Sequence, residues 1–281
     1  MSTEEDAFAV AREACAEIAR LRDPDRHFCA MFLPPKVRAC AFVLIAFNYE
    51  LSRATVLPVS GSLTGPMAGL IRLQWWRDVI AEPARGIQAR HDVAVAVAGL
   101  LRQERVAAEA LLSLVDARET ELYRVPDQAA WRQMMLGGSG MVQRMVAGLL
   151  GEADEAVLAT VARSGAAFAV GALLRHLPGV LRSGRMPLPV EVLRAVGLES
   201  DAEPGDLFGP GRLESVSSWL RQEGLALLPG RLESQSRTSR LAMLPGVLAA
   251  RDLRRGTAVA GEVSRGIGDR LAVAIAGLRR R

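Results

Sequence analysis

Residues 37–57 contain the polar side chains that are best placed to bind a ligand. Apolar and polar residues recur there at helical spacing, in the order Val37, Ala41, Leu44, Asn48, Leu51, Ser52 and Val56. An apolar helix face that ends in amide and hydroxyl groups is typical of a deep ligand cavity in a helical bundle. A buried helix whose Asn48 and Ser52 bond only to backbone groups is the alternative, and both interpretations stay open.

Prolines delimit this segment, because Pro34 and Pro35 suit a helix start and Pro58 ends it. About ten further segments keep the helical period. They cover 6–21, 28–33, 67–81, 92–103, 107–123, 128–150, 155–182, 213–228, 232–251 and 263–281. Gly137, Gly138 and Gly140 thin the 128–150 segment, and 199–210 is an acidic Gly/Pro loop. Short links predict one all-α domain over 1–281, a single large bundle of about ten helices.

The charged residues limit the classes of partner. The chain has 281 residues, of which half are apolar, and a net charge of +4 from 35 basic and 31 acidic residues. Lys36 is the only lysine. The planar guanidinium group of arginine binds phosphates and carboxylates through paired hydrogen bonds. Codon usage alone also produces a preference for arginine over lysine. Because the basic residues are scattered among acids and no aromatic residues interleave with them, the sequence argues against nucleic-acid binding.

Cysteine and histidine spacing argues against a metal site. Cys15, Cys29 and Cys40 are odd in number and form no Cys-x-x-Cys pair, which predicts free core thiols in a reducing compartment. The three histidines have no ligand spacing either. The longest uncharged run, 54–71, contains Pro and Gly and is a loop, not a membrane span. Residues 1–6 are no signal peptide, so we expect a cytoplasmic protein without a transmembrane segment.

From residue 21 onward the order of segments resembles the squalene/phytoene synthase family, the head-to-head branch of the isoprenoid synthase fold. One helix of that family carries Tyr-Ala-Phe-Cys-Arg-x-x-Asp-Asp-x-x-Asp. Residues 46–56 take its place and read Ala-Phe-Asn-Tyr-Glu-Leu-Ser-Arg-Ala-Thr-Val. The family's three acids fall on Ser52, Arg53 and Val56. The resemblance implies a helical bundle with a central cavity.

A second family segment, Asn-x-x-Arg-Asp-x-x-Glu-Asp followed by Arg-Gly-Arg-x-Tyr-Leu-Pro, resembles residues 172–189. The matching residues are Arg175, Gly184, Arg185, Leu188 and Pro189. The acids of this segment fall on His176, Gly179 and Val180. Residues 114–123 resemble Leu-Ile-Asp-x-x-x-x-Asp-Leu, with Asp116 and Glu121 as the acids. No Asp-x-x-x-Asp motif occurs in the chain.

Three shorter segments are similar to one branch of the family. They are 23–26 (Asp-Pro-Asp-Arg), 46–51 (Ala-Phe-Asn-Tyr-Glu-Leu) and 72–78 (Arg-Leu-Gln-Trp-Trp-Arg-Asp). That branch contains the mitochondrial respiratory complex I assembly factor and bacterial relatives, and it also lacks the acidic pairs. The resemblance implies a pseudoenzyme with a role in complex I biogenesis.

The missing acids matter because family enzymes hold the leaving diphosphate through Mg²⁺ bridged to carboxylates on two facing helices. A positive charge at the position of Arg53, about 4 Å from a divalent ion, would repel it by about 8 kcal/mol at an effective dielectric of about 20. We therefore expect no metal and no cofactor. The expected function is that of a non-catalytic binding or assembly protein, whose partner is a protein or a prenyl lipid.

Two alternatives retain chemistry at the same place. An active prenyl-diphosphate transferase would use relocated acids and Mg²⁺, with Asp116, Glu121, Asp78 and Glu50 as the candidate ligands. Alternatively, side chains bind a diphosphate or carboxylate directly, with candidates Asn48, Arg53, Arg175, Arg182 and Arg185. These arginines could equally pair with acids inside the bundle.

Two further expectations concern lipids. A prenyl-lipid or quinone binder would use an elongated cavity lined by Leu44, Phe47, Phe168 and Ala172. Arginine and apolar residues in 271–281 predict peripheral contact with the inner face of a membrane, whereas a core-packed terminal helix is the alternative.

Overall fold

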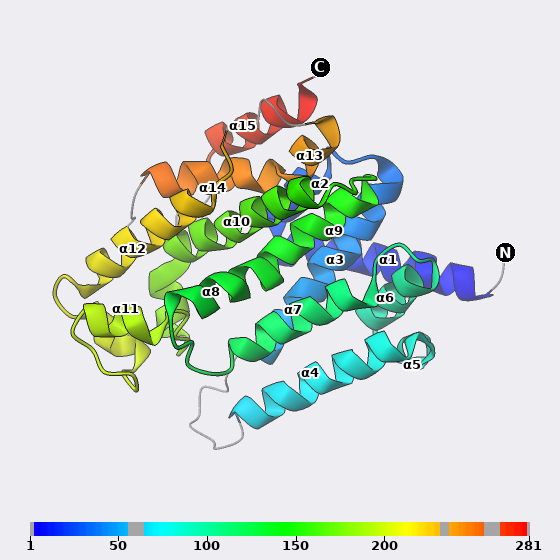
Figure 1. The fold of residues 1–281 in the computed structure, drawn as a ribbon. Coiled ribbons are helices and arrows are strands. Elements are labelled where there is room, and N and C mark those ends of the chain that lie inside the picture. Colours follow the sequence, from blue (N-terminus) through cyan, green and yellow to red (C-terminus); the bar gives the residue numbers. More distant parts are fainter. Residues whose placement is uncertain (1–2, 56–64, 231–235, 256–264, 280–281) are drawn as a thin grey trace.

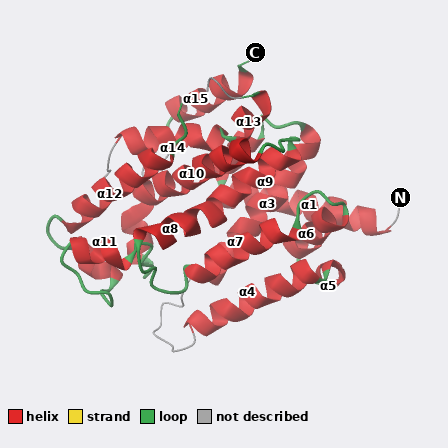
Figure 2. Ribbon diagram, viewed as in Figure 1, coloured by secondary structure: helices red, strands yellow, loops and turns green. Residues whose placement is uncertain are grey.

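The computed structural model describes residues 3–55, 65–230, 236–255 and 265–279, and helices dominate them (Figure 1). Figure 2 shows helices joined by loops, and these described residues contain no strand. The all-α prediction is confirmed. The helices are more numerous than expected because several are short.

The long helices are α1 (Thr3–Arg22), α3 (Pro35–Ala54), α4 (Gly65–Ala81), α6 (Asp92–Arg102), α7 (Ala108–Thr120), α10 (Glu155–Arg182), α12 (Arg212–Leu227), α14 (Leu244–Arg255) and α15 (Ile267–Leu278). The shorter ones are α2 (Pro24–Ala30), α5 (Pro83–Gln88), α8 (Gln128–Met135), α9 (Met141–Leu149), α11 (Val190–Ala195) and α13 (Arg237–Ala242). A π-helix, η1 (Leu136–Gly140), joins α8 to α9, and a 3₁₀ helix, η2 (Pro204–Phe208), precedes α12.

Helix α10 is the centre of the bundle and contacts α14, α12, η1 and α9 (Figure 1). Its first turn is capped by Asp154, whose carboxylate accepts the backbone N–H groups of Ala156 and Val157 at 2.8 and 3.3 Å. By length and composition α10 is able to cross a membrane, but 56% of its apolar window is buried inside the protein. Its contacts on every side are those of a core helix.

Helix α3 packs against α1 and supplies the inner wall of the bundle. Prolines start it as expected, with Pro35 at its first position. Leu44 and Phe47 are fully buried, and the Phe47 ring meets the Trp76 ring edge-on at 5.0 Å. Leu44 and Phe47 therefore face packed side chains, whereas Phe168 and Ala172, which were expected to line the same cavity, line pockets on α10.

The expected helix over 128–150 is three elements, and glycines explain the change. A Cβ on Gly140 would lie 2.7 Å from the Ala162 carbonyl oxygen, and one on Gly165 would lie 2.7 Å from that of Ser139. The backbones of η1 and α10 therefore cross so closely that a residue with a Cβ atom would clash at either position. The extra residue of π-helix η1 accommodates the crossing, which joins the α8–α9 rod to α10.

The C-terminal elements also differ from expectation. The predicted helix 232–251 is divided at Met243, and α14 begins anew with Pro245 in its first turn, where a proline needs no backbone partner. Residues 231–235 and 256–264 lie outside the described part. Helices α5 and α11 were not expected, because each spans less than two turns.

Candidate functional site

A pocket of about 500 Å³ lies where the ends of α7, α8 and α10 meet, and we call it the α7–α10 pocket. Most of its wall is apolar. The apolar lining residues include Leu122, Val125, Met134, Met135, Ala169, Leu173, Val180 and Met186. Flexible methionine side chains adapt to irregular ligands, so the wall suits an elongated apolar molecule.

One polar network lies at the α3 side of this pocket. Arg118 donates hydrogen bonds to Glu121 at 2.5 Å and to Asn48 at 3.0 Å. Arg185 donates to the other oxygen of Glu121 at 3.0 Å, and the Thr55 hydroxyl lies 3.5 Å from that oxygen. The half-buried carboxylate of Glu121 therefore accepts a hydrogen bond from a different guanidinium group at each of its two oxygens.

The Mg²⁺ cluster that the resemblance implies does not fit these residues. Mg²⁺ needs several unengaged oxygen ligands in near-octahedral array. The carboxylates lining the α7–α10 pocket are Glu121, which two arginines occupy, and Glu203, which begins η2. Among the residues that the structure describes, no three His, Cys, Asp or Glu side chains are grouped closely enough to hold a metal ion.

The first set of emptied acidic positions lies mostly outside the pocket. The Ser52 hydroxyl donates to the Tyr49 carbonyl oxygen at 2.7 Å, as in the backbone-bonded interpretation. Arg53 is exposed and pairs with Glu50 at 3.2 Å. Because Arg53 does not line the α7–α10 pocket, the repulsion of an ion that we expected from it does not operate there. Val56 lies outside the described residues.

The second set lies on α10 and faces the cavities more directly. Val180 lines the α7–α10 pocket, and His176 lines both this pocket and a second one. Gly179, between them, lines neither. An imidazole and a methyl pair thus lie where the family sequence carries carboxylates.

The remaining candidate residues are dispersed. Asp116 is exposed and pairs with Arg77 at 2.7 Å, and the same guanidinium holds Glu119. Arg182 lies over the Phe208 ring, 5.5 Å from its centroid. Among the candidate ligand-binding residues, the structure brings Asn48, Glu121 and Arg185 into one network and leaves the others outside it. Arg118 completes this network, and no sequence motif identified it.

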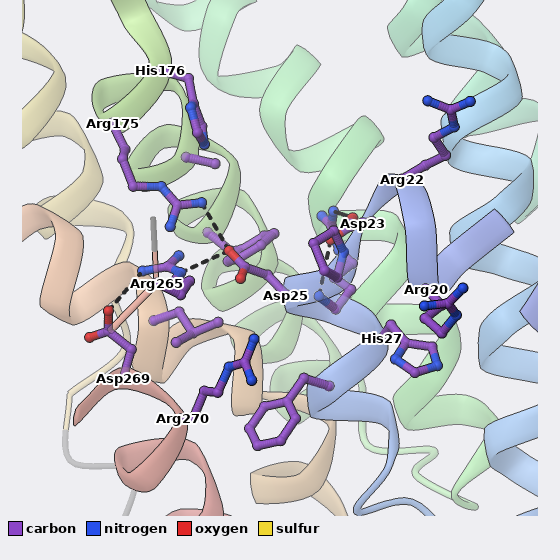
Figure 3. Close-up of a pocket in the computed structure, with 16 residues that line it drawn as sticks. Arg20, Arg22, Asp23, Asp25, His27, Arg175, His176, Arg265, Asp269 and Arg270 are labelled. Carbon is purple, nitrogen blue, oxygen red and sulfur yellow. Dashed lines mark hydrogen bonds and ion pairs between the residues drawn. The ribbon is translucent and has the colours of Figure 1, made fainter. Parts of the chain in front are cut away.

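A second, larger cavity of about 790 Å³ lies between α2, α10 and the start of α15, and we call it the α2–α10 pocket. It shares Ala172 and His176 with the first pocket, so the two are neighbours across α10. Its lining is mainly charged (Figure 3). Figure 3 shows Arg175 and Arg265 converging on Asp25, with Asp269 and Arg270 below them in the view.

Buried ion pairs close one side of the α2–α10 pocket. Asp25 accepts from Arg175 at 3.0 Å and from Arg265 at 2.9 Å. Arg265 also makes a bidentate pair with Asp252 at 2.6 and 2.8 Å. Burial lowers the pKa of Arg265, but the bonds to Asp252 and Asp25 outweigh it and raise the pKa. Burial raises the pKa of Asp252, and the hydrogen bonds and positive charge of Arg265 offset only part of that rise. The network ties α2, α10 and α14 together.

A second carboxylate anchors the last helix. Asp269 accepts from Arg251 at 2.6 Å and from Arg255 at 2.9 Å. Burial raises the pKa of Asp269, but the hydrogen bonds from Arg255 and Arg251 outweigh it and hold the pKa at about 2. No sequence motif indicated a role for these residues. The available signal was that Asp252 and Asp269 are isolated acids in segments otherwise rich in arginine.

The chain is similar to proteins of known family. The family model for squalene/phytoene synthase matches residues 19–281. Two relatives carry the name NADH dehydrogenase (ubiquinone) complex I, assembly factor 6. Those from Bos taurus and Homo sapiens are each 28% identical over 120 residues, covering 43% of this chain. The match spans 33% of the length of these relatives.

Solved structures share the fold at low identity. The squalene synthase HpnC from Alicyclobacillus acidocaldarius has a TM-score of 0.65 at 16% identity, over 88% of this chain and 95% of that one. A dehydrosqualene synthase in complex with ligand has a TM-score of 0.68 at 11% identity, over 97% of each chain. YisP from Bacillus subtilis has a TM-score of 0.66 at 12% identity, over 98% of this chain and 99% of that one. The resemblance inferred from the motifs is confirmed.

Proposed function

Since the chain belongs to the squalene/phytoene synthase family, we propose that it is a non-catalytic member that uses the family frame to bind or assemble a partner. One observation carries this proposal. The central carboxylate of the α7–α10 pocket, Glu121, is neutralised by Arg118 and Arg185. A carboxylate in two charge-assisted bonds is a poor metal ligand, the acids of the family's two Asp-rich segments are replaced here, and Asp116 is exposed and paired with Arg77.

The proposed process is the assembly of respiratory complex I. The relatives named complex I assembly factor 6 support it, over the part of their length that matches. The partner is then a protein of that complex or of its assembly intermediates. The three cysteines of this chain are free and buried, which suits a reducing compartment such as the cytoplasm.

An activity assay tests the non-catalytic part of the proposal. The purified protein is incubated with farnesyl or geranylgeranyl diphosphate and Mg²⁺, beside a structural relative that is a working synthase. We expect no product above the protein-free background. Turnover that disappears in Glu121→Gln but persists in Glu155→Gln, whose carboxylate lies in an exposed ion pair, would overturn the proposal.

A genetic experiment tests the assembly part. Deletion of the gene in its source organism should lower the amount of intact complex I on native gels, together with NADH–quinone activity. The wild-type chain should restore both. Normal complex I in the deletion strain would rule this function out, whatever the activity assay shows.

The wall of the α7–α10 pocket favours a second candidate, a prenyl-lipid or quinone binder. Native mass spectrometry of the gently isolated protein would then show a retained lipid. Ala169→Phe, which places a ring in the pocket, should release it. Retention of the same lipid by this variant would show that the lipid binds elsewhere.

A further inference from the structure

Helix α15 carries an apolar stripe that the described part of the chain leaves exposed. Ile267, Leu271, Ile275 and Leu278 are 87, 57, 55 and 70% exposed. Their spacing of four, four and three residues places them on one side of the helix. In Figure 1 α15 lies at the edge of the molecule beside α14 and close to the C-terminus. Four large aliphatic side chains in one exposed row are unusual on a soluble surface.

The inner face of α15 is held mainly by charge. Asp269 and Val273 are buried on that face, and Gly277 approaches the Phe32 ring. Asp269 is gripped by Arg251 and Arg255 of α14. The helix therefore buries its carboxylate and exposes most of its large aliphatic side chains, the reverse of an ordinary surface helix. This orientation is fixed by ion pairs and leaves the apolar stripe available.

The surroundings of the stripe are basic. The described residues of 236–255 and 265–279 contain eight arginines: Arg237, Arg240, Arg251, Arg254, Arg255, Arg265, Arg270 and Arg279. The acids of the same residues are Asp252 and Asp269, both buried in ion pairs with arginines. Among these described residues, the exposed charges are therefore all positive.

We propose that α15 docks on an anionic phospholipid bilayer, with its aliphatic stripe in the interface and the flanking arginines on lipid phosphates. An apolar row bordered by arginine is the arrangement of helices that lie in the membrane plane. Each arginine near an anionic surface adds an attraction that salt screens. This inference is independent of the proposed assembly function. A protein partner or a second copy of the chain would not require that all exposed charges of the described border be basic.

A second exposed stripe provides a matched control. Met67, Ile71 and Trp75 of α4 are exposed at the same helical spacing. Charges of both signs accompany them, since Arg72 and Asp78 lie on the same helix. Helix α4 lies at the edge of the molecule opposite α15 (Figure 1). Replacing an α4 residue removes comparable apolar surface without touching the proposed membrane face.

Vesicle flotation tests the proposal. The full chain is mixed with vesicles of phosphatidylcholine, or of phosphatidylcholine with about one third phosphatidylglycerol. We expect binding to the anionic vesicles and little to the neutral ones. Leu271→Gln with Ile275→Gln should weaken binding by at least about tenfold, because each side chain contributes through its buried apolar area. Ile71→Gln should leave binding unchanged, and raising the salt from about 0.05 to about 0.5 M should weaken it.

A fluorophore distinguishes insertion from a folding defect. The native cysteines are all buried, so an added surface thiol is labelled selectively in the folded protein. An environment-sensitive dye on Leu278→Cys should shift to the blue on anionic vesicles, whereas the same dye on Ile71→Cys should not shift.

The opposite outcomes overturn the proposal. Equal binding to neutral vesicles, an unaffected Leu271/Ile275 double variant, or a dye shift at position 71 alone would each contradict docking through α15. Absence of vesicle binding with concentration-dependent dimerisation that the double variant abolishes would assign the stripe to a second copy instead.

Discussion

Replacing Asp269 by Asn measures how much one buried carboxylate stabilises the C-terminal layer. Its side chain is 1% exposed, while those of Arg251 and Arg255 are 36 and 49% exposed. Lowering its pKa from 3.8 to about 2 corresponds to about 2 kcal/mol of folding free energy. Removing one partner of a fully buried pair costs about 3 to 5 kcal/mol. Water can reach both arginines once the carboxylate is gone, so we expect a loss of about 2 to 3 kcal/mol.

Urea unfolding followed by circular dichroism measures this loss at neutral pH, with Glu155→Gln as an exposed control that should not change the midpoint. The pH dependence follows from the lowered pKa. The stabilisation is complete above the unfolded pKa of 3.8 and disappears as the pH falls toward about 2, so the gap between wild type and Asp269→Asn should narrow over that interval. A gap below about 0.5 kcal/mol at neutral pH, or one that acid leaves unchanged, would refute the reasoning.

Three other measurements follow from the structure. Trp131→Ala removes a fully buried ring and its indole bond to a backbone carbonyl at 2.8 Å, and should lower the unfolding free energy by about 3 to 5 kcal/mol in urea titrations. Glu121→Gln leaves two arginines unneutralised, so calorimetry without Mg²⁺ should show pyrophosphate binding at least about tenfold tighter than in the wild type. Burial raises the pKa of Cys15 to about 12 and that of Cys29 further, so neither should react with iodoacetamide at neutral pH until the protein is unfolded, as mass spectrometry will show.

The long elements were predictable because their signals are local. Asp154 and the apolar period set the bounds of α10, and the paired prolines set the start of α3. The division at Met243 was not predicted, although Pro245 marked it, because an apolar period continues across the break. The sequence predicted that the glycines break or thin this helix, but it did not predict the π-helix itself. The close approach of α10 that requires Gly140 is a tertiary contact, and no single segment encodes it.

The site was predictable in position but not in its pairing. The second motif segment lies on α10, and two of its positions, His176 and Val180, line the α7–α10 pocket, whereas Ser52 and Arg53 of the first segment do not. The partners were not readable, because Arg118 and Glu121 meet Arg185 only through the packing of α7 on the rest of the bundle. The direction of the Arg53 side chain was not predictable from the sequence either. A shift of one residue along a helix turns a side chain by about 100°, which is enough to move the guanidinium from a pocket into solvent.

The crossing of Gly140 and Gly165 has a consequence for sequence drift. Acidic motifs can be lost one substitution at a time while the bundle keeps its shape, because carboxylates at a cavity wall support no packing. Neither glycine has that freedom, since even a methyl group would meet a carbonyl oxygen at 2.7 Å. Among diverging sequences with this fold, we therefore expect the two glycines to be retained after the acidic motifs are lost. The glycine pair could then identify distant family members that lack those motifs.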